Sequence, residues 1–339
     1  MHPAHFKNKK LLLGAQEAGS GSLLAALCRG WKPAPGTVAL ISDIARPYFE
    51  GIENIHIIPV DREVTQEQVD AIIRESDPEY IITGASAGMC VEKRLMKSAH
   101  KASCKVVSFV DHYWNLWQRF ANTETTEKWE YQPDMIFVSA EVCKDKMLSL
   151  GCTASEIGIY QHPLLHDVFP SPLHSASETF SLLGLAEDSV PVVFVSEYVF
   201  PGSDIWHWDQ PQASDIDNTL ISMLDAATSL NETGCRMVLI IKKHPTQTQS
   251  FAPILAKFPP TLYREIGKFD KASLFQVSKM MIGLNSMFLL EAAENGVDAY
   301  SYCGKMPQHS VLLTDINTKI KPIHSLRSII EIMSSYCRV

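Results

Sequence analysis

The sequence lacks the motifs that most often reveal a function. No run of apolar residues approaches the ~20 that a membrane-spanning helix needs, so we expect no transmembrane segment. A loop of small residues at 15–22 is followed by no Gly-Lys-Ser/Thr, so it is not a P-loop, and it is no clean dinucleotide fingerprint either. Histidines, cysteines and carboxylates show no metal-ligand spacing, so we expect no metal site.

Excess positive charge and paired cysteines are also missing. The formal net charge of −8 argues against binding to nucleic acid as the main role. The eight cysteines are scattered without a Cys-x-x-Cys pair, so we expect reduced thiols and not a disulfide framework. With 46% hydrophobic and 20% charged residues, the composition is typical of a soluble globular protein. We expect a cytoplasmic protein, or one attached peripherally to the inner membrane.

Short apolar strands alternate with helices along both halves of the chain, whose 339 residues suit two domains. In the first half we expect strands at 11–14, 37–42, 55–58, 80–84, 105–110, 134–139 and 156–160. In the second half we expect strands at 191–195, 237–241, 279–284 and 298–302. This alternation predicts α/β domains with doubly wound parallel sheets. Prolines and serines at 163–177 indicate a linker.

The stretch 237–245 is the strongest single indication of a site. Five apolar residues at 237–241 are typical of a strand buried on both faces. The next four residues are Lys242, Lys243, His244 and Pro245. Open α/β sheets bind ligands at the carboxyl ends of their strands, and positive charge with hydrogen-bond donors suits a phosphate. The alternative is a solvated loop in which His244 merely ends the strand.

Two stretches of the first half carry candidate acid–base groups. The loop after the first strand contains one ionisable residue, Glu17, which is either a catalytic base or a carboxylate that complements the dipole of the next helix. The strand at 105–110 ends at Asp111 and His112. Burying either would need a partner, so Asp111 is our second candidate base, with His112 orienting it. The aromatic rings at 114–120 have helical spacing, which favours a core role over stacking on a sugar.

The remaining candidates also follow strands of the second half. Strand 191–195 is followed by Ser196 and Glu197, and strand 279–284 leads into a helix through Asn285 and Ser286. Asn or Ser there caps the helix, and the same geometry leaves N–H groups for a phosphate. Glu291, within that helix, either accepts hydrogen bonds from sugar hydroxyls or faces solvent. We predict that a nucleotide sugar is bound by Ser196, Glu197, Lys243, His244, Pro245, Asn285, Ser286 and Glu291.

Two doubly wound halves with a closing C-terminal helix resemble the GT-B architecture of nucleotide-sugar glycosyltransferases and UDP-N-acetylglucosamine 2-epimerases. The element 242–245 resembles the His-Pro motif of bacterial capsule and lipopolysaccharide enzymes that use CMP-activated sugars, which implies that His244 and Pro245 line the nucleotide-phosphate pocket. In the same way Asn285-Ser286 matches the family's serine-containing helix start, and Glu291 matches a ribose-binding glutamate. The first loop is similar to the acceptor-side glycine loop, which implies an acceptor site made of Gly14, Gly19, Ser20 and Ser22.

The resemblance implies a domain plan and a reaction. An acceptor-side Rossmann-like domain would span 1–168 and a nucleotide-sugar domain 169–322, with the two facing a cleft. A C-terminal helix at 323–339 would pack back on the N-terminal domain. We expect a glycosyltransferase without metal or cofactor that moves a sugar from a CMP- or UDP-sugar to a carbohydrate or glycoconjugate acceptor in bacterial surface-polysaccharide synthesis. The alternatives are a nucleotide-sugar 2-epimerase or hydrolase, and a noncatalytic nucleotide-binding subunit of a polysaccharide assembly.

Overall fold

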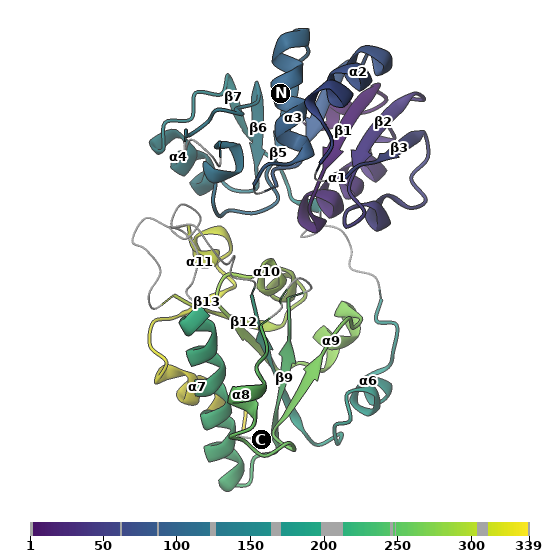
Figure 1. The fold of residues 1–339 in the computed structure, drawn as a ribbon. Coiled ribbons are helices and arrows are strands. Elements are labelled where there is room, and N and C mark those ends of the chain that lie inside the picture. The colour runs from purple at the N-terminus through teal and green to yellow at the C-terminus, as the bar shows by residue number, and fades with distance from the viewer. Residues whose placement is uncertain are drawn as a thin grey trace. The chain divides into compact units, whose positions relative to one another are not determined.

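The structure is a computed structural model, and it describes residues 3–61, 63–86, 88–122, 127–163, 171–197, 213–244, 247, 249–303 and 311–337. The chain divides into two units, Met1–His166 and Asp167–Val339. Each unit is an α/β structure built on its own sheet (Figure 1). Of the predicted site residues, Pro245 lies outside the described residues.

The first unit is organised around a sheet in which the described residues form seven parallel strands, in the order β3-β2-β1-β4-β5-β6-β7. The strands are β1 Leu11–Ala15, β2 Thr37–Ile41, β3 Ile55–Pro59, β4 Tyr80–Thr83, β5 Val106–Phe109, β6 Met135–Val138 and β7 Glu156–Ile159. The helices are η1 Pro3–Phe6, α1 Ala18–Trp31, η2 Arg46–Phe49, α2 Gln66–Ser76, α3 Val91–Ala102, η3 Gln118–Phe120 and α4 Glu141–Ser149. The strand order reverses between β1 and β4, so ligands are expected where these two strands end.

Both faces of this sheet are covered, as the apolar strands predict. Side chains alternate along a strand, and Leu11, Leu13 and Ala15 pack in one core with Leu23 and Leu27 of α1. The opposite face carries α3, because a side chain at Gly14 would contact Leu95 of that helix. A helix on each face is the doubly wound arrangement expected from the sequence.

The second unit repeats this plan with a sheet in which the described residues form six parallel strands, in the order β10-β9-β8-β11-β12-β13. The strands are β8 Val190–Val195, β9 Met237–Lys242, β10 Tyr263–Ile266, β11 Met280–Gly283, β12 Asp298–Tyr302 and β13 Lys321–Ile323. The helices are α6 Ala176–Leu182, α7 Ala213–Glu232, α8 Ala252–Leu255, α9 Lys271–Val277, α10 Met287–Glu294, α11 Leu313–Ile316 and α12 Ser328–Ser334. Here the order reverses between β8 and β11.

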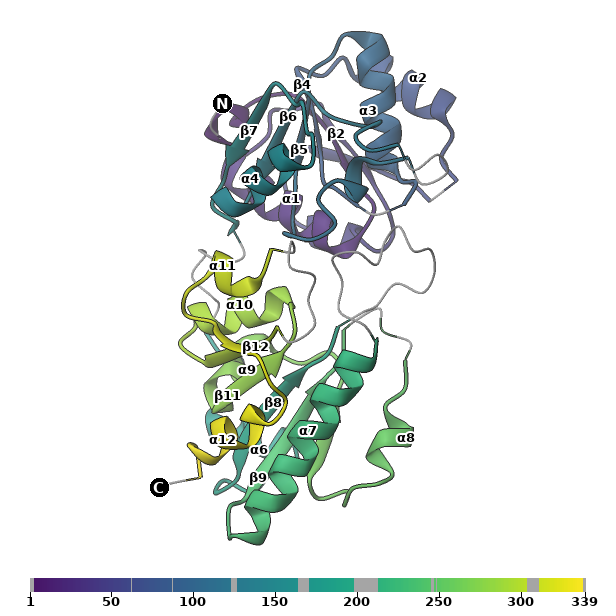
Figure 2. The same cartoon turned by 90° about the vertical axis from the view of Figure 1, so that its left-hand side faces the viewer.

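The helices of the second unit also lie on both faces of its sheet. Leu239 and Ile241 of β9 share a core with Leu220 of α7 and Ile329 of α12, and Figure 2 shows α7 lying along the sheet. The other face carries α10, because a side chain at Gly283 would contact Leu289. Side chains of β9 that point away from α7 therefore face the layer of α10.

Five elements of the second unit were not predicted, namely strands β10 and β13 and helices α6, α8 and α11. Strands β10 and β13 are the two edges of the sheet, and their sequences, Tyr-Arg-Glu-Ile and Lys-Pro-Ile, lack the apolar run by which buried strands are identified. Helix α6 begins inside the segment that we expected to be a linker. It is started by Ser175, whose Oγ accepts a hydrogen bond from the Glu178 backbone N–H at 3.3 Å, a capping box that marks a helix start.

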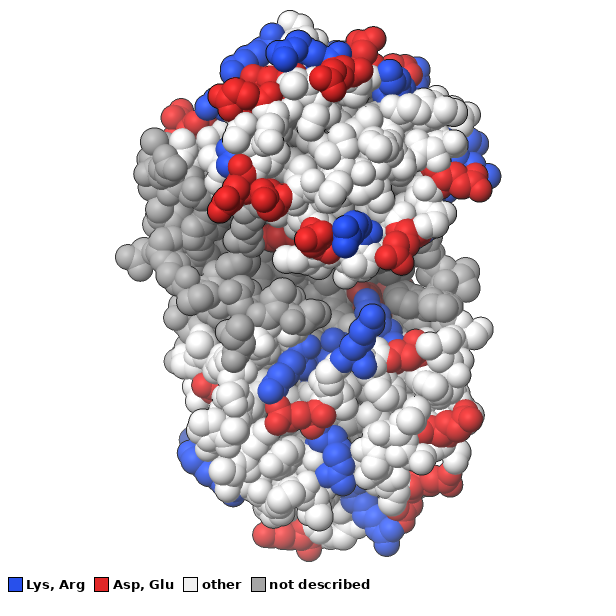
Figure 3. Space-filling model, turned by 45° about the vertical axis from the view of Figure 1, so that its right-hand side comes forward, with Lys and Arg blue, Asp and Glu red and all other residues white. Residues whose placement is uncertain are grey.

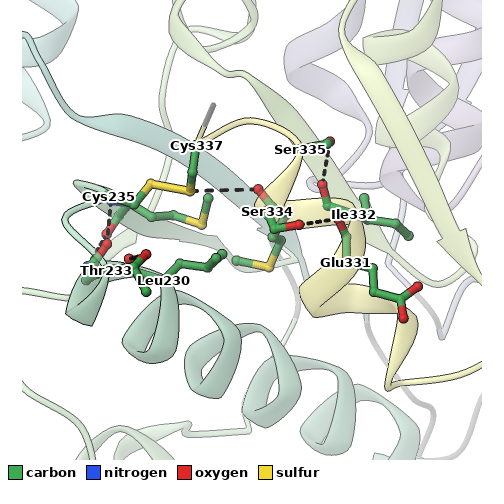
Figure 4. Close-up of a disulfide and its surroundings, with 11 residues drawn as sticks. Leu230, Thr233, Cys235, Glu331, Ile332, Ser334, Ser335 and Cys337 are labelled. Atoms are coloured by element: carbon green, nitrogen blue, oxygen red, sulfur yellow. Dashed lines mark hydrogen bonds between the residues drawn. A yellow bond between two sulfur atoms is a disulfide. The ribbon is translucent and has the colours of Figure 1, made fainter. Parts of the chain in front are cut away.

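The C-terminal segment departs from expectation in two ways. Helix α12 belongs to the second unit, where Ile329 and Met333 pack into the core beside α7, whereas we expected it to pack on the N-terminal domain. In addition, a disulfide joins Cys235, in the turn between α7 and β9, to Cys337 (Figure 4). The expectation of reduced thiols is therefore wrong for these two residues, and the other six cysteines are free. The link closes a loop of 102 residues.

The described helices include none that combines the length and the apolar character of a membrane span.

Candidate functional site

Glu92 ties together the loops that follow β1 and β4 in the first unit. It lies in the first turn of α3 and is 1% exposed. Its Oε1 accepts hydrogen bonds from the Gln16 backbone N–H at 2.9 Å, from the Ser20 hydroxyl at 3.3 Å and from the Ser86 hydroxyl. The buried Glu92 carboxylate therefore fixes the two loops at the point where the strand order reverses. No pattern in the sequence marks Glu92, because the helical pattern of 92–102 does not show which side chain turns inward.

Two of the predicted residues of the first loop, Glu17 and Ser20, belong to this cluster. Glu17 is the N-cap residue of α1, the helix-entry position that we considered beside a catalytic role. Its backbone N–H donates to Ser86 Oγ at 3.2 Å and to Ser20 Oγ at 3.3 Å. Ser20 and Ser86 share a hydrogen bond of 3.0 Å. These bonds fix the backbone from which the Glu17 carboxylate projects.

Asp111, at the end of the neighbouring strand β5, has a partner that sequence reasoning missed. Arg119 Nη1 lies 2.9 Å from Asp111 Oδ1, and the two side chains are 12% and 18% exposed. The guanidinium also donates to the carbonyl oxygens of Trp114, at 3.0 Å, and Ala85. The ring of His112 stacks on that of Tyr113 with centroids 4.4 Å apart. The ion pair with Arg119 holds the Asp111 carboxylate in place at the end of β5.

The other predicted residues of the first loop are explained by packing. A side chain at Gly14 would collide with Leu95 of α3, and one at Gly19 would collide with the Asp111 carboxylate. Ser22 is half-buried within α1. Trp114, Trp117 and Phe120 are buried, as their spacing predicts.

Gly19→Ala is expected to destabilise the protein by ~1–3 kcal/mol, the usual result of overpacking, because Arg119 holds the Asp111 carboxylate that the new methyl group would meet. The matched control is Gly30→Ala in the same helix, where nothing lies within 4 Å of the added carbon. That change should stabilise the protein by ~0.5–1 kcal/mol. Urea unfolding measures both, and equal effects at the two positions would contradict the close contact at Gly19.

In the second unit, a glutamine joins the ends of β8 and β9. Gln247 Oε1 accepts a hydrogen bond from the Ser196 hydroxyl at 2.7 Å and one from the His244 backbone N–H at 3.4 Å. Desolvation by the surrounding protein and the positive charge of Lys242 lower the pKa of the His244 imidazole, although the residue keeps an exposed surface. His244 is therefore neutral at pH 7 and can act as a hydrogen-bond donor or acceptor.

Glu197 connects the end of β8 to the start of α10, across the point of strand-order reversal. It is 5% exposed, and its Oε1 accepts a hydrogen bond from the Asn285 backbone N–H. Burial raises the pKa of the Glu197 carboxyl to about 8, against the lowering effect of backbone N–H groups. Neighbouring parallel strands end at the same edge of the sheet, and this places Ser196, Glu197 and Asn285 close together, as the sequence predicts.

The two lysines after 237–241 point to opposite sides of the sheet. Lys242 Nζ lies 4.6 Å from the centre of the Phe288 ring, in the first turn of α10. Lys243, the lysine that we predicted for the site, lies instead over Phe251 and forms an ion pair of 2.5 Å with Glu265 of β10. The lysine that faces α10 is therefore Lys242.

A second unpredicted cation, Lys271 of α9, completes this surface. Its Nζ lies 5.8 Å from the centre of the Phe288 ring and 2.5 Å from Oε2 of Glu291, whose side chain is 8% exposed. Burial, followed by the charge of Lys271, lowers the pKa of Lys242. Glu291 is therefore buried and paired with a cation, so the alternative that it faces solvent is wrong.

We call Glu197, Lys242, Lys271, Ser286 and Glu291 the α10 cluster. Ser286 caps α10, since its Oγ accepts a hydrogen bond from the Phe288 N–H at 3.3 Å. The helix start and two lysines add positive potential, and Figure 3 shows Lys and Arg side chains close together near the middle of the view. Such an arrangement can hold a phosphate or diphosphate group.

Solved structures of similar fold exist for the whole chain. A structure of MnaA with UDP from S. aureus has a TM-score of 0.66 at 9% identity and covers 98% of this chain and 88% of its own. A putative UDP-N-acetylglucosamine 2-epimerase from Listeria monocytogenes has a TM-score of 0.63 at 11% identity, with 97% and 88% covered. The UDP-GlcNAc 2-epimerase from Neisseria meningitidis bound to UDP-GlcNAc has a TM-score of 0.61 at 10% identity, with 96% and 90% covered.

These likenesses confirm the predicted fold class, a GT-B-like chain of two doubly wound Rossmann-like units. No protein-family model matches the chain, and no curated protein does either.

Proposed function

We propose that this chain binds a UDP-sugar through the α10 cluster of its second unit. The observation that carries the proposal is the position of Lys242 and Lys271, both over Phe288 at the start of α10. Two ammonium groups beside one ring form a surface that suits a doubly charged anion such as a nucleoside diphosphate. Glu291 keeps one carboxylate oxygen beside its ion pair, and we propose that this oxygen accepts a hydrogen bond from a ribose hydroxyl.

For the reaction we propose 2-epimerisation or hydrolysis of the bound nucleotide sugar. This was our alternative from the sequence, and the likeness to solved UDP-GlcNAc 2-epimerases supports it over transfer to a carbohydrate acceptor. Both reactions need a proton to be moved, and we propose Asp111 and Glu17 of the first unit as the groups that move it. A positioned carboxylate typically accelerates such a step ~10²–10⁴-fold.

We expect purified protein to convert UDP-GlcNAc without any acceptor, either to its 2-epimer or to UDP and free sugar, as followed by NMR of the anomeric protons. Asp111→Asn keeps an oxygen that can accept the hydrogen bond from Arg119 but removes the base, so its turnover should fall ~10²–10⁴-fold while UDP still binds.

Two outcomes would speak against this proposal. Turnover that appears only when a carbohydrate acceptor is added would restore the glycosyltransferase expected from the sequence. Turnover of CMP-sugars with none of UDP-sugars would contradict the choice of nucleotide.

A further inference from the structure

Glu197 is the one member of the α10 cluster that is a buried carboxyl group without an ion-pair partner among the described residues, and the proposed function gives it no role of its own. Its Oε1 accepts the hydrogen bond from the Asn285 N–H, next to the capping residue Ser286. Its Oε2 has no hydrogen-bond partner among the described residues. An ionised carboxylate that is buried without a countercharge is strongly unfavourable, and burial raises the pKa of Glu197 to about 8. Glu197 is therefore mostly protonated at pH 7.

The charged groups on the neighbouring elements have other contacts. Lys242 and His244 stand at the end of β9, Lys271 on α9 and Glu291 on α10. Lys271 pairs with Glu291 and Lys242 lies over Phe288. Among the residues that the structure describes, no cation forms an ion pair with Glu197. The protonation of Glu197 therefore depends on burial, on the backbone N–H groups before α10 and on any charge that a ligand brings to the start of that helix.

We propose that Glu197 is a positioning residue, which holds the loop before α10 and couples the binding of a nucleotide sugar's phosphates to the uptake of a proton. This rests on the phosphate site proposed above. Phosphates at the start of α10 would add negative charge beside the Glu197 carboxyl group. They would also accept hydrogen bonds from the backbone N–H groups of the loop before α10, the same groups that an ionised Glu197 would bind. Ionised Glu197 and bound phosphate therefore oppose each other, whereas protonated Glu197 tolerates the ligand.

The test is calorimetric titration with UDP-GlcNAc at pH 7, 8 and 9, in two buffers with different ionisation enthalpies. If only the protonated form binds, wild-type affinity should fall about tenfold from pH 7 to pH 9, with about half a proton taken up per ligand at pH 8. Glu197→Gln, which resembles the protonated acid in shape and can still accept the Asn285 hydrogen bond, should bind without proton uptake. Its affinity should change by less than twofold over this range.

Two controls separate Glu197 from other groups. Glu265→Gln changes a carboxylate of the same unit that pairs with Lys243, and it should keep the wild-type pH dependence. The pKa of His244 is lowered from 6.5, so this residue stays neutral from pH 7 to pH 9. Wild-type affinity that is constant over this range, or Glu197→Gln protein that keeps the wild-type dependence, overturns the inference.

Failure of UDP-GlcNAc to bind the wild type at any pH would instead overturn the proposed function. In that case, urea unfolding of wild type and Glu197→Gln at several pH values tests the protonation of Glu197 without a ligand. Because its folded pKa lies above the ordinary value of 4.5, the wild type should lose stability relative to Glu197→Gln as the pH rises from 5 to 8. A stability difference that stays constant over this window overturns the inference.

Discussion

Lys242→Met is expected to weaken the binding of UDP-GlcNAc by about 30-fold or more, the usual effect of removing one partner of a desolvated charge pair. Lys242 is the cation that faces α10, with its Nζ 4.6 Å from the centre of the Phe288 ring. Methionine keeps the apolar stem that packs there and removes only the charge. Calorimetric titration of wild type and variant measures the loss.

The neighbouring lysine provides the matched control. Lys243 faces the other side of the sheet and pairs with Glu265, so Lys243→Met should change the affinity less than threefold. Stability gives a second check. Burial and the charge of Lys271 lower the pKa of Lys242, so its charge opposes folding, and Lys242→Met should melt no lower than wild type. A loss of binding in Lys243→Met but not in Lys242→Met would contradict the placement of the phosphates.

Reduction of the disulfide between Cys235 and Cys337 is expected to produce the largest change in stability. Closing a loop of 102 residues restricts the unfolded chain, and the chain-entropy model gives an upper value of ~4–5 kcal/mol for a loop of this length. Urea unfolding with and without reductant should show a lower midpoint for the reduced protein. Cys235→Ser should unfold like the reduced wild type, and reductant should not change it.

Thiol counting gives an independent check of the same bond. Six of the eight cysteines are free, so unfolded, unreduced protein should react with six equivalents of a thiol reagent, and reduced protein with eight. Eight equivalents without reductant, or one midpoint under both conditions, would contradict the link.

The strands at the centre of each sheet could be predicted because their signal is local. Runs such as 237–241 must be buried on both faces, so the sequence itself specifies a parallel α/β layer. The edge strands β10 and β13 carry polar residues and a proline, and they are strands only because a neighbour offers hydrogen bonds. Whether such a segment becomes a strand depends on the tertiary structure, and the local sequence does not show it.

The same distinction explains the site. Strand ends could be found from the sequence, so Ser196, Glu197 and Asn285 were expected together. Alternation along β9 requires Lys242 and Lys243 to face opposite sides, but it does not show which side carries α10. The ion-pair partners could not be predicted from the sequence, because they come from other elements of the fold: Arg119 pairs with Asp111, and Lys271 pairs with Glu291.

The disulfide shows a further limit. A count of scattered cysteines does not reveal which pair meets. Cys235 and Cys337 come together only because α12 packs beside α7, which depends on the folded second unit.

A crystal structure of the protein with UDP tests the central claim most directly. We expect the diphosphate at the start of α10, within hydrogen-bonding distance of the Lys242 ammonium group and the Ser286 hydroxyl, with a ribose hydroxyl on Glu291. UDP bound elsewhere, with Lys242 and the start of α10 untouched, would contradict the account.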